Sequence, residues 1–330
     1  MLNPDAKIKE SKAMEATRDG FGKALLELGE SNPQVVVLCA DLAESTRVLP
    51  FKEKYPGRYI ELGVAEQNLA TVAAGLANYG KIPFITSYAT FSPGRNNEQI
   101  RTTIALNNVP VKIAGSHAGL SVGPDGATHQ ALEDIALTRV LPNMVVVSPC
   151  DSEEARKATL AVAAHPGPAY LRLGRAATPV MTTAETPFEL GKAQTVWSSE
   201  HGAEVAVFAT GPLLYNALCA AKELEHRIPV EVINIHTIKP LDAGAVVAAA
   251  RGAGAVVTVE EHQAAGGLGG AIAEILAGEC PTPVEFVAVQ DCFGQSGEPG
   301  ELAAHYGLDT SAILKAIQKA HTRRNKPEIK

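Results

Sequence analysis

Short apolar runs alternate with stretches of helical period along the first half of the chain. The runs are rich in Val and Ile and have the length of strands, and their continuous apolar character is typical of strands buried on both faces of a parallel sheet. The strands predicted in this way are Val35–Cys39, Ile82–Thr86, Val111–Ala114, Met144–Ser148 and Ala169–Leu173. The helices predicted between them are Ser11–Leu28, Ala65–Asn78, Asn96–Asn107, Gln130–Val140 and Ser152–Ala164. This alternation with short links predicts a doubly wound α/β domain.

The pattern pauses between Thr178 and Gln194, where Thr, Pro and Glu are frequent and no period is evident. We interpret this stretch as a linker at a domain boundary. A second α/β series follows it. Its predicted strands are Glu204–Ala209, Val230–Ile235, Ala255–Glu260 and Val284–Val289, and its predicted helices are Leu213–Arg227, Ala243–Ala253, Leu268–Ala277 and Thr310–His321. The sequence therefore predicts two α/β domains, residues 1–185 and a smaller one at 190–330.

Composition and charge exclude several classes of protein. Hydrophobic residues make up 46% and charged residues 20% of the chain, which excludes disorder over most of its length. Every long apolar stretch contains a charge or a breaker, so no membrane-spanning helix is predicted. The polar N-terminus lacks the apolar core of a signal peptide, and we expect a cytoplasmic protein. A net charge of −7 offers no broad surface for nucleic acid.

Two smaller features lead to structural interpretations. The basic cluster of Arg323, Arg324 and Lys326 is interpreted as a solvated end of the chain. The five cysteines are far apart, odd in number and never spaced as C-x-x-C, which favours buried reduced thiols over a zinc site or a disulfide framework. They are Cys39, Cys150, Cys219, Cys280 and Cys292.

Candidate chemistry is found where the predicted strands end, at the edge of an open α/β sheet where ligands bind. Glu66 lies in the first turn of a predicted helix. There it could simply complement the helix dipole, which is worth about 0.3–1 kcal/mol, or it could face a ligand. Tyr88 and Phe91 lie in a loop after the next strand. Such rings usually pack onto the core, and the alternative is stacking on a flat heterocycle.

The glycine-rich stretch AGSHAGLSVGPDGATHQ, residues 114–130, carries His117, Asp125 and His129. Long glycine-rich loops at a sheet edge are often functional, whereas a lone histidine is usually structural, so both interpretations stay open here. The two histidines are far apart in the sequence, with no Cys or paired carboxylates beside them, and a metal site is not supported.

Taken in order, LGVAEQN, YATFSPGRN, SHAGLSVGPDGATHQ and LRLGRAATP resemble the C-terminal half of transketolase. The chain resembles more closely the separate C-terminal subunit that occurs where transketolase is encoded as two chains, over essentially its whole length. The resemblance implies a pyrimidine-binding doubly wound parallel-sheet domain followed by a smaller α/β C-terminal domain. It also implies thiamine diphosphate with a divalent metal (Mg²⁺ or Ca²⁺), and transfer of a two-carbon ketol unit from a ketose phosphate to an aldose phosphate, as in the pentose phosphate pathway.

The resemblance implies cofactor roles for three residues. Glu66 matches the glutamate that hydrogen-bonds N1′ of the cofactor's aminopyrimidine, a task that requires a carboxyl group in a poorly solvated pocket. Phe91 matches the aromatic residue that stacks on the aminopyrimidine. Asp41, in CADLAES, matches an aspartate close to the thiamine site.

Other positions match residues that bind the donor sugar. His117 and His129 match two histidines that face the sugar, and imidazoles suit proton transfer because they titrate near neutrality. Asp125 matches an aspartate that binds a donor hydroxyl. The group that binds the sugar's terminal phosphate is matched by Arg18, Ser45 and Arg175, and guanidinium groups bind phosphate oxygens in pairs.

The sequence also departs from the family pattern. A second aromatic residue often follows the one matched by Phe91, but Ser92–Arg95 holds none and leaves one wall of the pyrimidine site open. The GDG sequence that holds metal and diphosphate in thiamine enzymes is absent, and Pro124–Gly126 reads PDG without the following Asn. The glycine cluster Gly266–Gly270 does not complete G-x-G-x-x-G, and we interpret it as close helix–strand packing or a subunit contact.

We therefore expect the diphosphate and metal to be held by an N-terminal partner subunit. Two copies of each chain would form an α2β2 complex with the cofactor at their interface. Two alternatives stay open. The chain could belong to another thiamine enzyme, such as a deoxyxylulose-phosphate synthase or the β subunit of a 2-oxoacid dehydrogenase. It could also be a non-catalytic half that serves as a scaffold.

Overall fold

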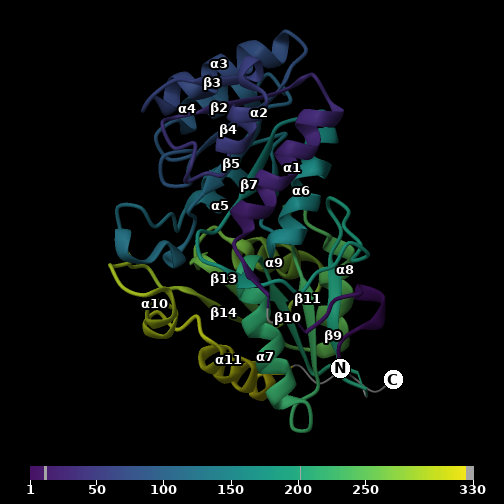
Figure 1. Cartoon of the computed structure of the whole chain (residues 1–330). Coiled ribbons are helices and arrows are strands. Elements are labelled where there is room, and N and C mark those ends of the chain that lie inside the picture. The colour runs from purple at the N-terminus through teal and green to yellow at the C-terminus, as the bar shows by residue number, and fades with distance from the viewer. Residues whose placement is uncertain (11–12, 201, 325–330) are drawn as a thin grey trace.

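The computed structural model, which describes residues 1–10, 13–200 and 202–324, places two sheets one beyond the other along the molecule (Figure 1). The first sheet has the strand order β12-β6-β7-β5-β4-β2-β3, in which β12 alone is antiparallel to its neighbour. Its strands are β2 (Val35–Cys39), β3 (Tyr59–Glu61), β4 (Ile82–Tyr88), β5 (Lys112–Ser116), β6 (Val145–Val147), β7 (Ala169–Arg172) and β12 (Thr237–Lys239). This is the parallel α/β sheet that the apolar runs predict.

Helices cover both faces of the first sheet, which explains the unbroken apolar runs. In β2, Val35 and Val37 pack in one core cluster and Val36 and Leu38 in another, so that alternate side chains enter opposite layers. One layer holds α1 (Thr17–Ser31), α2 (Leu49–Lys54) and α6 (Ser152–Ala164). The other layer holds α3 (Glu66–Asn78), the short α4 (Asn97–Gln99), a π-helical turn at Ile100–Ala105 and α5 (Asp134–Arg139).

The second sheet has the strand order β14-β13-β10-β11-β9, with β9 antiparallel to β11. Its strands are β9 (Gln194–Ser198), β10 (Val205–Ala209), β11 (Val230–Asn234), β13 (Val256–Gln263) and β14 (Val284–Val289). The helices are α7 (Leu214–Leu224) and α11 (Thr310–Thr322) on one face, α8 (Ala243–Ala253) and α9 (Leu268–Glu279) on the other, and α10 (Pro299–His305) beyond β14 (Figure 1).

The two halves of the chain are joined by more than a linker. Strand β12 comes from the second half and pairs with β6 of the first sheet, where Thr237 lies opposite Val147. One hydrophobic cluster runs through both halves and includes Ile113 of β5 and Phe208 of β10. The N-terminal strand β1 (Met14–Glu15) pairs with β8 (Thr178–Pro179), within the predicted linker. The division into residues 1–185 and 190–330 stays a prediction.

Several helices differ from the predicted spans. The helix expected from Ser11 begins at Thr17, and Ser11 itself lies outside the described residues. The segment expected as a helix from Gln130 is helical only from Asp134 to Arg139. Ala131 instead forms a bridge with Ala118, and Gln130 uses its side chain to bind the carbonyl oxygens of Leu120 and Gln295.

Strands β9 and β12 have no predicted counterpart. Both lie at sheet edges, and β12 reads Thr-Ile-Lys, which is too short to show a pattern.

The glycine cluster Gly266–Gly270 allows close packing of a helix on strands, which is one of the two interpretations given to it above. A Cβ on Gly267 would lie 2.0 Å from an oxygen of Glu260, and one on Gly269 would lie 2.4 Å from the Phe286 ring. The α9 N-terminus therefore packs directly on β13 and β14, with the Glu260 carboxylate accepting the Leu268 and Gly269 N–H groups.

Two surface expectations are corrected. Arg324 is partly buried and pairs with Glu204, so it is not fully solvated; Arg323 pairs with Glu285 but stays exposed, and Lys326 lies outside the described residues. The cysteines are free but not all buried, because Cys292 is exposed. Among the described residues, no helix is long and apolar enough to cross a membrane.

Candidate functional site

The candidate residues lie at one edge of the first sheet because they follow the carboxyl ends of parallel strands. Asp41 follows β2, Glu66 follows β3, Phe91 follows β4, His117 follows β5 and Arg175 follows β7. Side chains from five separate segments therefore meet at the edge where open α/β sheets bind ligands.

Glu66 is a buried carboxylate at the start of α3. Its side chain is only 3% exposed. The Ser87 hydroxyl donates to Oε1 at 3.1 Å, and Arg95 Nη1 lies 3.4 Å from Oε2. Asn96 Nδ2 donates to the Glu66 carbonyl oxygen at 3.0 Å, which fixes the first turn of the helix against the loop after β4. The carboxylate also lines an open hollow of about 590 Å³, so it complements the helix N-terminus and remains placed to meet a ligand.

An aromatic cluster stands beside this carboxylate. The rings of Tyr88 and His117 stack with centroids 3.9 Å apart, and those of Tyr88 and Phe91 lie 5.8 Å apart at 21°. Phe91 meets His129 edge-on at 5.4 Å. The guanidinium carbon of Arg95 lies 4.0 Å from the Phe91 centroid, a cation–π arrangement. Arg95 thus lies beside Phe91, where related sequences often have a second aromatic residue. It is not among the predicted site residues.

The hydrogen bonds of His117 assign its tautomer. Arg18 Nη1 lies 3.2 Å from Nε2, and the Ser116 hydroxyl lies 2.9 Å from Nδ1. A guanidinium can only donate, so Nε2 accepts and the ring proton is on Nδ1, which donates to the Ser116 oxygen. His117 therefore presents a neutral imidazole whose lone pair is already directed at a cation.

The surroundings keep His117 neutral over the physiological range. Burial, together with the positive charges of Arg18, Arg175 and Arg47, lowers its pKa to about 3. The expectation that this imidazole titrates near neutrality is wrong, because burial and, after it, three arginines from distant segments oppose its protonation. His129 Nδ1 lies 2.9 Å from the Thr128 hydroxyl.

The shifted pKa of His117 should make stability depend on pH. The unfolded side chain takes up a proton near its ordinary pKa of 6.5, but the folded one does so only near 3. Unfolding therefore binds a proton between these values, and stability is lost as the pH falls below 6.5. We expect the free energy of unfolding to fall by about 2 kcal/mol more between pH 7 and pH 5 in the natural chain than in His117→Gln. Urea unfolding at both pH values measures this. Parallel curves for the two proteins would contradict it.

The residues expected to bind phosphate form a positive group around His117. Arg18 Nη1 donates to the carbonyl oxygen of Ser45 at 2.8 Å, and its buried Nε has no hydrogen-bond partner among the described residues. Burial and the charges of Arg47 and Arg175 lower the pKa of Arg18. Ser45 thus takes part through its backbone. Arg47 is a further member that the sequence does not predict, because nothing in its local sequence marks it.

Asp41 and Asp125 lie at the rim of the site with exposed side chains. Asp41 has a φ of +60° and donates its N–H to Glu61 Oε1 at 2.8 Å. Asp125 ends the helical turn η4 (Leu120–Asp125). Their expected roles toward a cofactor and a sugar stay predictions, as do the roles of the other site residues.

The donor set suits a flat, basic heterocycle and an anion. A buried carboxylate can bind a ring nitrogen, the half-buried Phe91 ring offers a stacking surface beside it, and Arg18 offers an unpaired N–H. Within the described residues, no cluster of three or more His, Cys, Asp or Glu side chains is arranged to hold a metal ion.

Comparison with known proteins gives matches along nearly the whole chain. Residues 13–181 match the family model of the transketolase pyrimidine-binding domain, and residues 191–313 match that of the transketolase C-terminal domain. A 6-deoxy-6-sulfo-D-fructose transketolase subunit of Clostridium sp. (strain MSTE9) is 40% identical over 309 residues, which cover 93% of this chain and 95% of that protein. An apulose-4-phosphate transketolase subunit of Phocaeicola vulgatus is 37% identical, covering 92% and 96%.

A solved structure has the same fold. It is described as a split-gene transketolase, inactive beta4 tetramer, and it superposes with a TM-score of 0.87 at 45% identity. The match covers 94% of this chain and 99% of that one.

Proposed function

Because the chain belongs to the transketolase family, we propose that it is the C-terminal subunit of a two-chain transketolase. In this proposal the complex uses thiamine diphosphate to transfer a two-carbon ketol unit from a ketose phosphate to an aldose phosphate. The observation that carries the proposal is the buried Glu66 carboxylate beside the Phe91 ring, at the edge of the sheet where two imidazoles and an arginine group also lie.

The residues present fit the pyrimidine end of thiamine diphosphate. The Glu66 carboxyl group would share its proton with the ring's N1′, which has a lone pair and no hydrogen of its own, and Phe91 would stack on the ring, with Asp41 at the rim. When bound, the cofactor supplies the carbon nucleophile and the electron sink for ketol transfer. The contribution of this chain is to hold the ring, with Ser87 fixing the Glu66 carboxylate at 3.1 Å.

The sugar would be bound by the loop after β5 and by the arginines. Arg18 and Arg175 would bind its terminal phosphate, because their guanidinium groups converge on one side of the site with Arg18 Nε unpaired. His117, held neutral, would orient Arg18, whose Nη1 lies 3.2 Å from its Nε2, rather than carry a proton. His129, which meets the Phe91 ring, would move the proton as the bond between C2 and C3 of the donor breaks.

We also propose that an N-terminal partner subunit holds the diphosphate and the divalent metal, in a complex of two chains of each kind. The chain has no GDG sequence. The relatives from Clostridium and Phocaeicola are named as subunits, and the related structure is described as an inactive tetramer of β chains. These observations support a site that is completed by another polypeptide.

Reconstitution tests the proposed function. The purified chain, thiamine diphosphate and Mg²⁺ should show no ketol transfer from xylulose 5-phosphate to ribose 5-phosphate, whereas addition of an N-terminal subunit should give turnover and a complex of two plus two chains. Transfer by the chain alone would contradict the partner requirement. Turnover of pyruvate instead of the ketose would favour another thiamine enzyme, and no cofactor binding with any partner would favour the scaffold interpretation.

The substrate range requires its own assay, because the names of the relatives differ in their sugars. The same reconstituted pair should be offered 6-deoxy-6-sulfofructose and apulose 4-phosphate beside xylulose 5-phosphate. We expect xylulose 5-phosphate to give the highest kcat/KM. A higher kcat/KM for either of the other sugars would show that this sugar is the preferred donor.

A further inference from the structure

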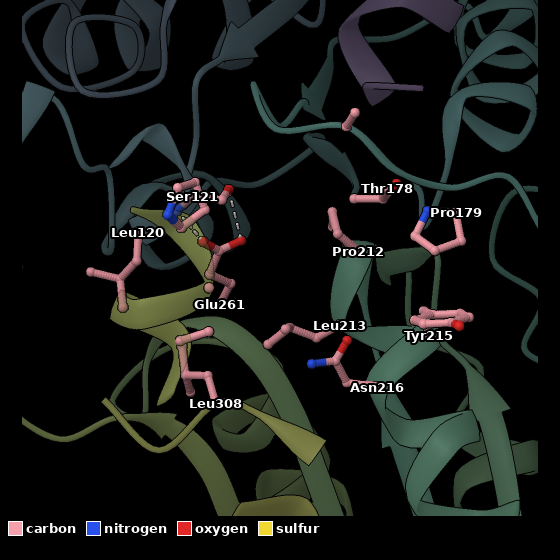
Figure 2. Close-up of a pocket in the computed structure, with 14 residues that line it drawn as sticks. Leu120, Ser121, Thr178, Pro179, Pro212, Leu213, Tyr215, Asn216, Glu261 and Leu308 are labelled. Carbon is pink, nitrogen blue, oxygen red and sulfur yellow. Dashed lines mark hydrogen bonds between the residues drawn. The ribbon is translucent and has the colours of Figure 1, made fainter. Parts of the chain in front are cut away.

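The loop that carries Asp125 and His129 is held by a carboxylate from the second half of the chain. Glu261, on β13, is 7% exposed. Its Oε1 accepts the Ser121 N–H at 2.5 Å, and its Oε2 accepts the Ser121 hydroxyl at 3.3 Å (Figure 2). One buried carboxylate therefore takes both donors of a single loop residue, an arrangement that fixes its position and orientation.

The loop backbone lies directly on this carboxyl group. A Cβ on Gly119 would come within 2.4 Å of the Glu261 carboxyl carbon, and Gly119 also has a φ of +83°. Only glycine combines this backbone conformation with so close an approach. The contact therefore depends on Glu261 in β13 and on a glycine at position 119 in the loop.

A second tie closes the far end of the same loop. Gln130, which follows His129 and is 4% exposed, donates from Nε2 to the carbonyl oxygen of Gln295 at 3.0 Å and to that of Leu120 at 3.3 Å. Gln295 belongs to the segment before α10, and α10 packs against η4. The second half of the chain therefore contacts the loop at its middle and at its end.

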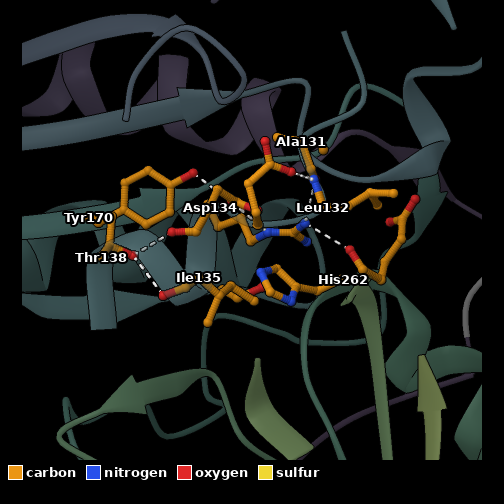
Figure 3. Close-up of polar contacts among 12 residues, drawn as sticks. Ala131, Leu132, Asp134, Ile135, Thr138, Tyr170 and His262 are labelled. Atoms are coloured by element: carbon orange, nitrogen blue, oxygen red, sulfur yellow. Dashed lines mark hydrogen bonds and ion pairs between the residues drawn. The ribbon is translucent and has the colours of Figure 1, made fainter. Parts of the chain in front are cut away.

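Glu261 is itself fixed to the first sheet. Arg172, on β7, donates to the Glu261 carbonyl oxygen at 2.8 Å and to that of Ala131 at 3.3 Å. The same guanidinium pairs with Asp134, which also accepts the Tyr170 hydroxyl at 2.7 Å (Figure 3). The backbone of Glu261 is therefore held by the same strand that leads to Arg175.

We propose that Glu261 is a positioning residue for substrate binding, which acts by holding Ser121 so that the loop presents Asp125 and His129 to the donor sugar. The inference rests on the proposed function, and it gives the C-terminal domain a task in the reaction. The Glu261 carboxylate contacts Ser121 of the loop and is not among the residues proposed to bind cofactor or sugar.

Hydrogen exchange on the chain alone tests the anchoring without any turnover. In Glu261→Gln one Ser121 donor loses its acceptor, and we expect the amides of residues 118–130 to exchange about tenfold faster or more. The matched control is Glu274→Gln, because Glu274 is an exposed glutamate of the same half whose partner is Arg139. Equal loop protection in the natural chain and Glu261→Gln would overturn the proposal.

Kinetics of the reconstituted complex test the consequence. Glu261→Gln should raise the KM for the donor about tenfold, because Asp125 is displaced, and should also lower kcat, because His129 is displaced, whereas Glu274→Gln should leave both unchanged. A fall in kcat with unchanged KM would overturn the positioning role.

If Glu261→Gln does not fold, Ser121→Ala removes only the hydroxyl contact and should show a smaller change in the same direction. If no variant or natural complex transfers a ketol unit, the proposed function fails, while the exchange measurement still decides the anchoring.

Discussion

Glu66→Gln should reduce ketol transfer by the reconstituted complex by about 10²–10⁴-fold, the range associated with loss of a group that handles a proton in the transition state. Glutamine has the shape of glutamate, and its amide can still contact the Ser87 hydroxyl that lies 3.1 Å from Oε1. What it loses is the acidic proton that a carboxyl group can share with the aminopyrimidine nitrogen. The packing of α3 should therefore persist while the chemistry fails.

Three measurements separate this result from misfolding. The variant should assemble with its partner as the natural chain does, and its urea midpoint should stay close to that of the natural chain. Glu53→Gln, which changes an exposed glutamate on α2, should keep full turnover. Turnover by Glu66→Gln within a factor of about three of the natural rate would reject the assigned role, since general acid–base groups contribute far more.

The largest effect on stability is expected at the junction of the two halves. Asp134 and Arg172 form an ion pair at 2.8 Å with side chains 1% and 4% exposed. Although burial opposes ionisation, the Arg172 charge and the Tyr170 hydroxyl hold the pKa of Asp134 below its usual range. Arg172→Met leaves that carboxylate buried without its cation, and we expect it to lower the free energy of unfolding by about 3–5 kcal/mol.

Two comparisons test whether the loss comes from the unpaired charge. The double variant Asp134→Leu with Arg172→Met removes both charges and should recover much of the stability. Arg227→Met breaks an exposed pair with Glu223 at 3.9 Å and should cost no more than about 0.5 kcal/mol. A loss in Arg172→Met as small as that in Arg227→Met, both measured by urea unfolding, would show that the pair does not hold the junction.

The regular part of the fold follows from local patterns. The runs that become β2 and β10 could be predicted because both strands are apolar at every position, as burial on both faces favours. The edge strand β12 could not, because its pairing with β6 depends on a partner far away in the chain. The segment after Gln130 has a helical period in its side chains, which predicts a helix, but the side chain of Gln130 is bound to backbone elsewhere.

The sequence predicts which candidate residues lie together better than it predicts their protonation and contacts. The resemblance gives Glu66, Phe91, His117 and His129 at one sheet edge, and the structure brings them together. The lowered pKa of His117 could not be foreseen, because it depends on the burial of the ring and on arginines from several segments. The sequence shows only that Ser92–Arg95 lacks the second aromatic residue that is frequent in the family. The structure adds that the Arg95 guanidinium lies over the Phe91 ring.

The pairing of β12 with β6 limits how chains of this family can be divided or fused with one another. Because Thr237–Lys239 closes the edge of the first sheet at β6, a first half expressed without it would expose the unpaired backbone of a strand, which favours pairing with other molecules. A cut at the linker near residue 185 would therefore not yield two self-sufficient modules. Chimaeras between related chains should keep β6 and β12 from the same parent, so that this edge remains sealed by a strand that matches it in length and register.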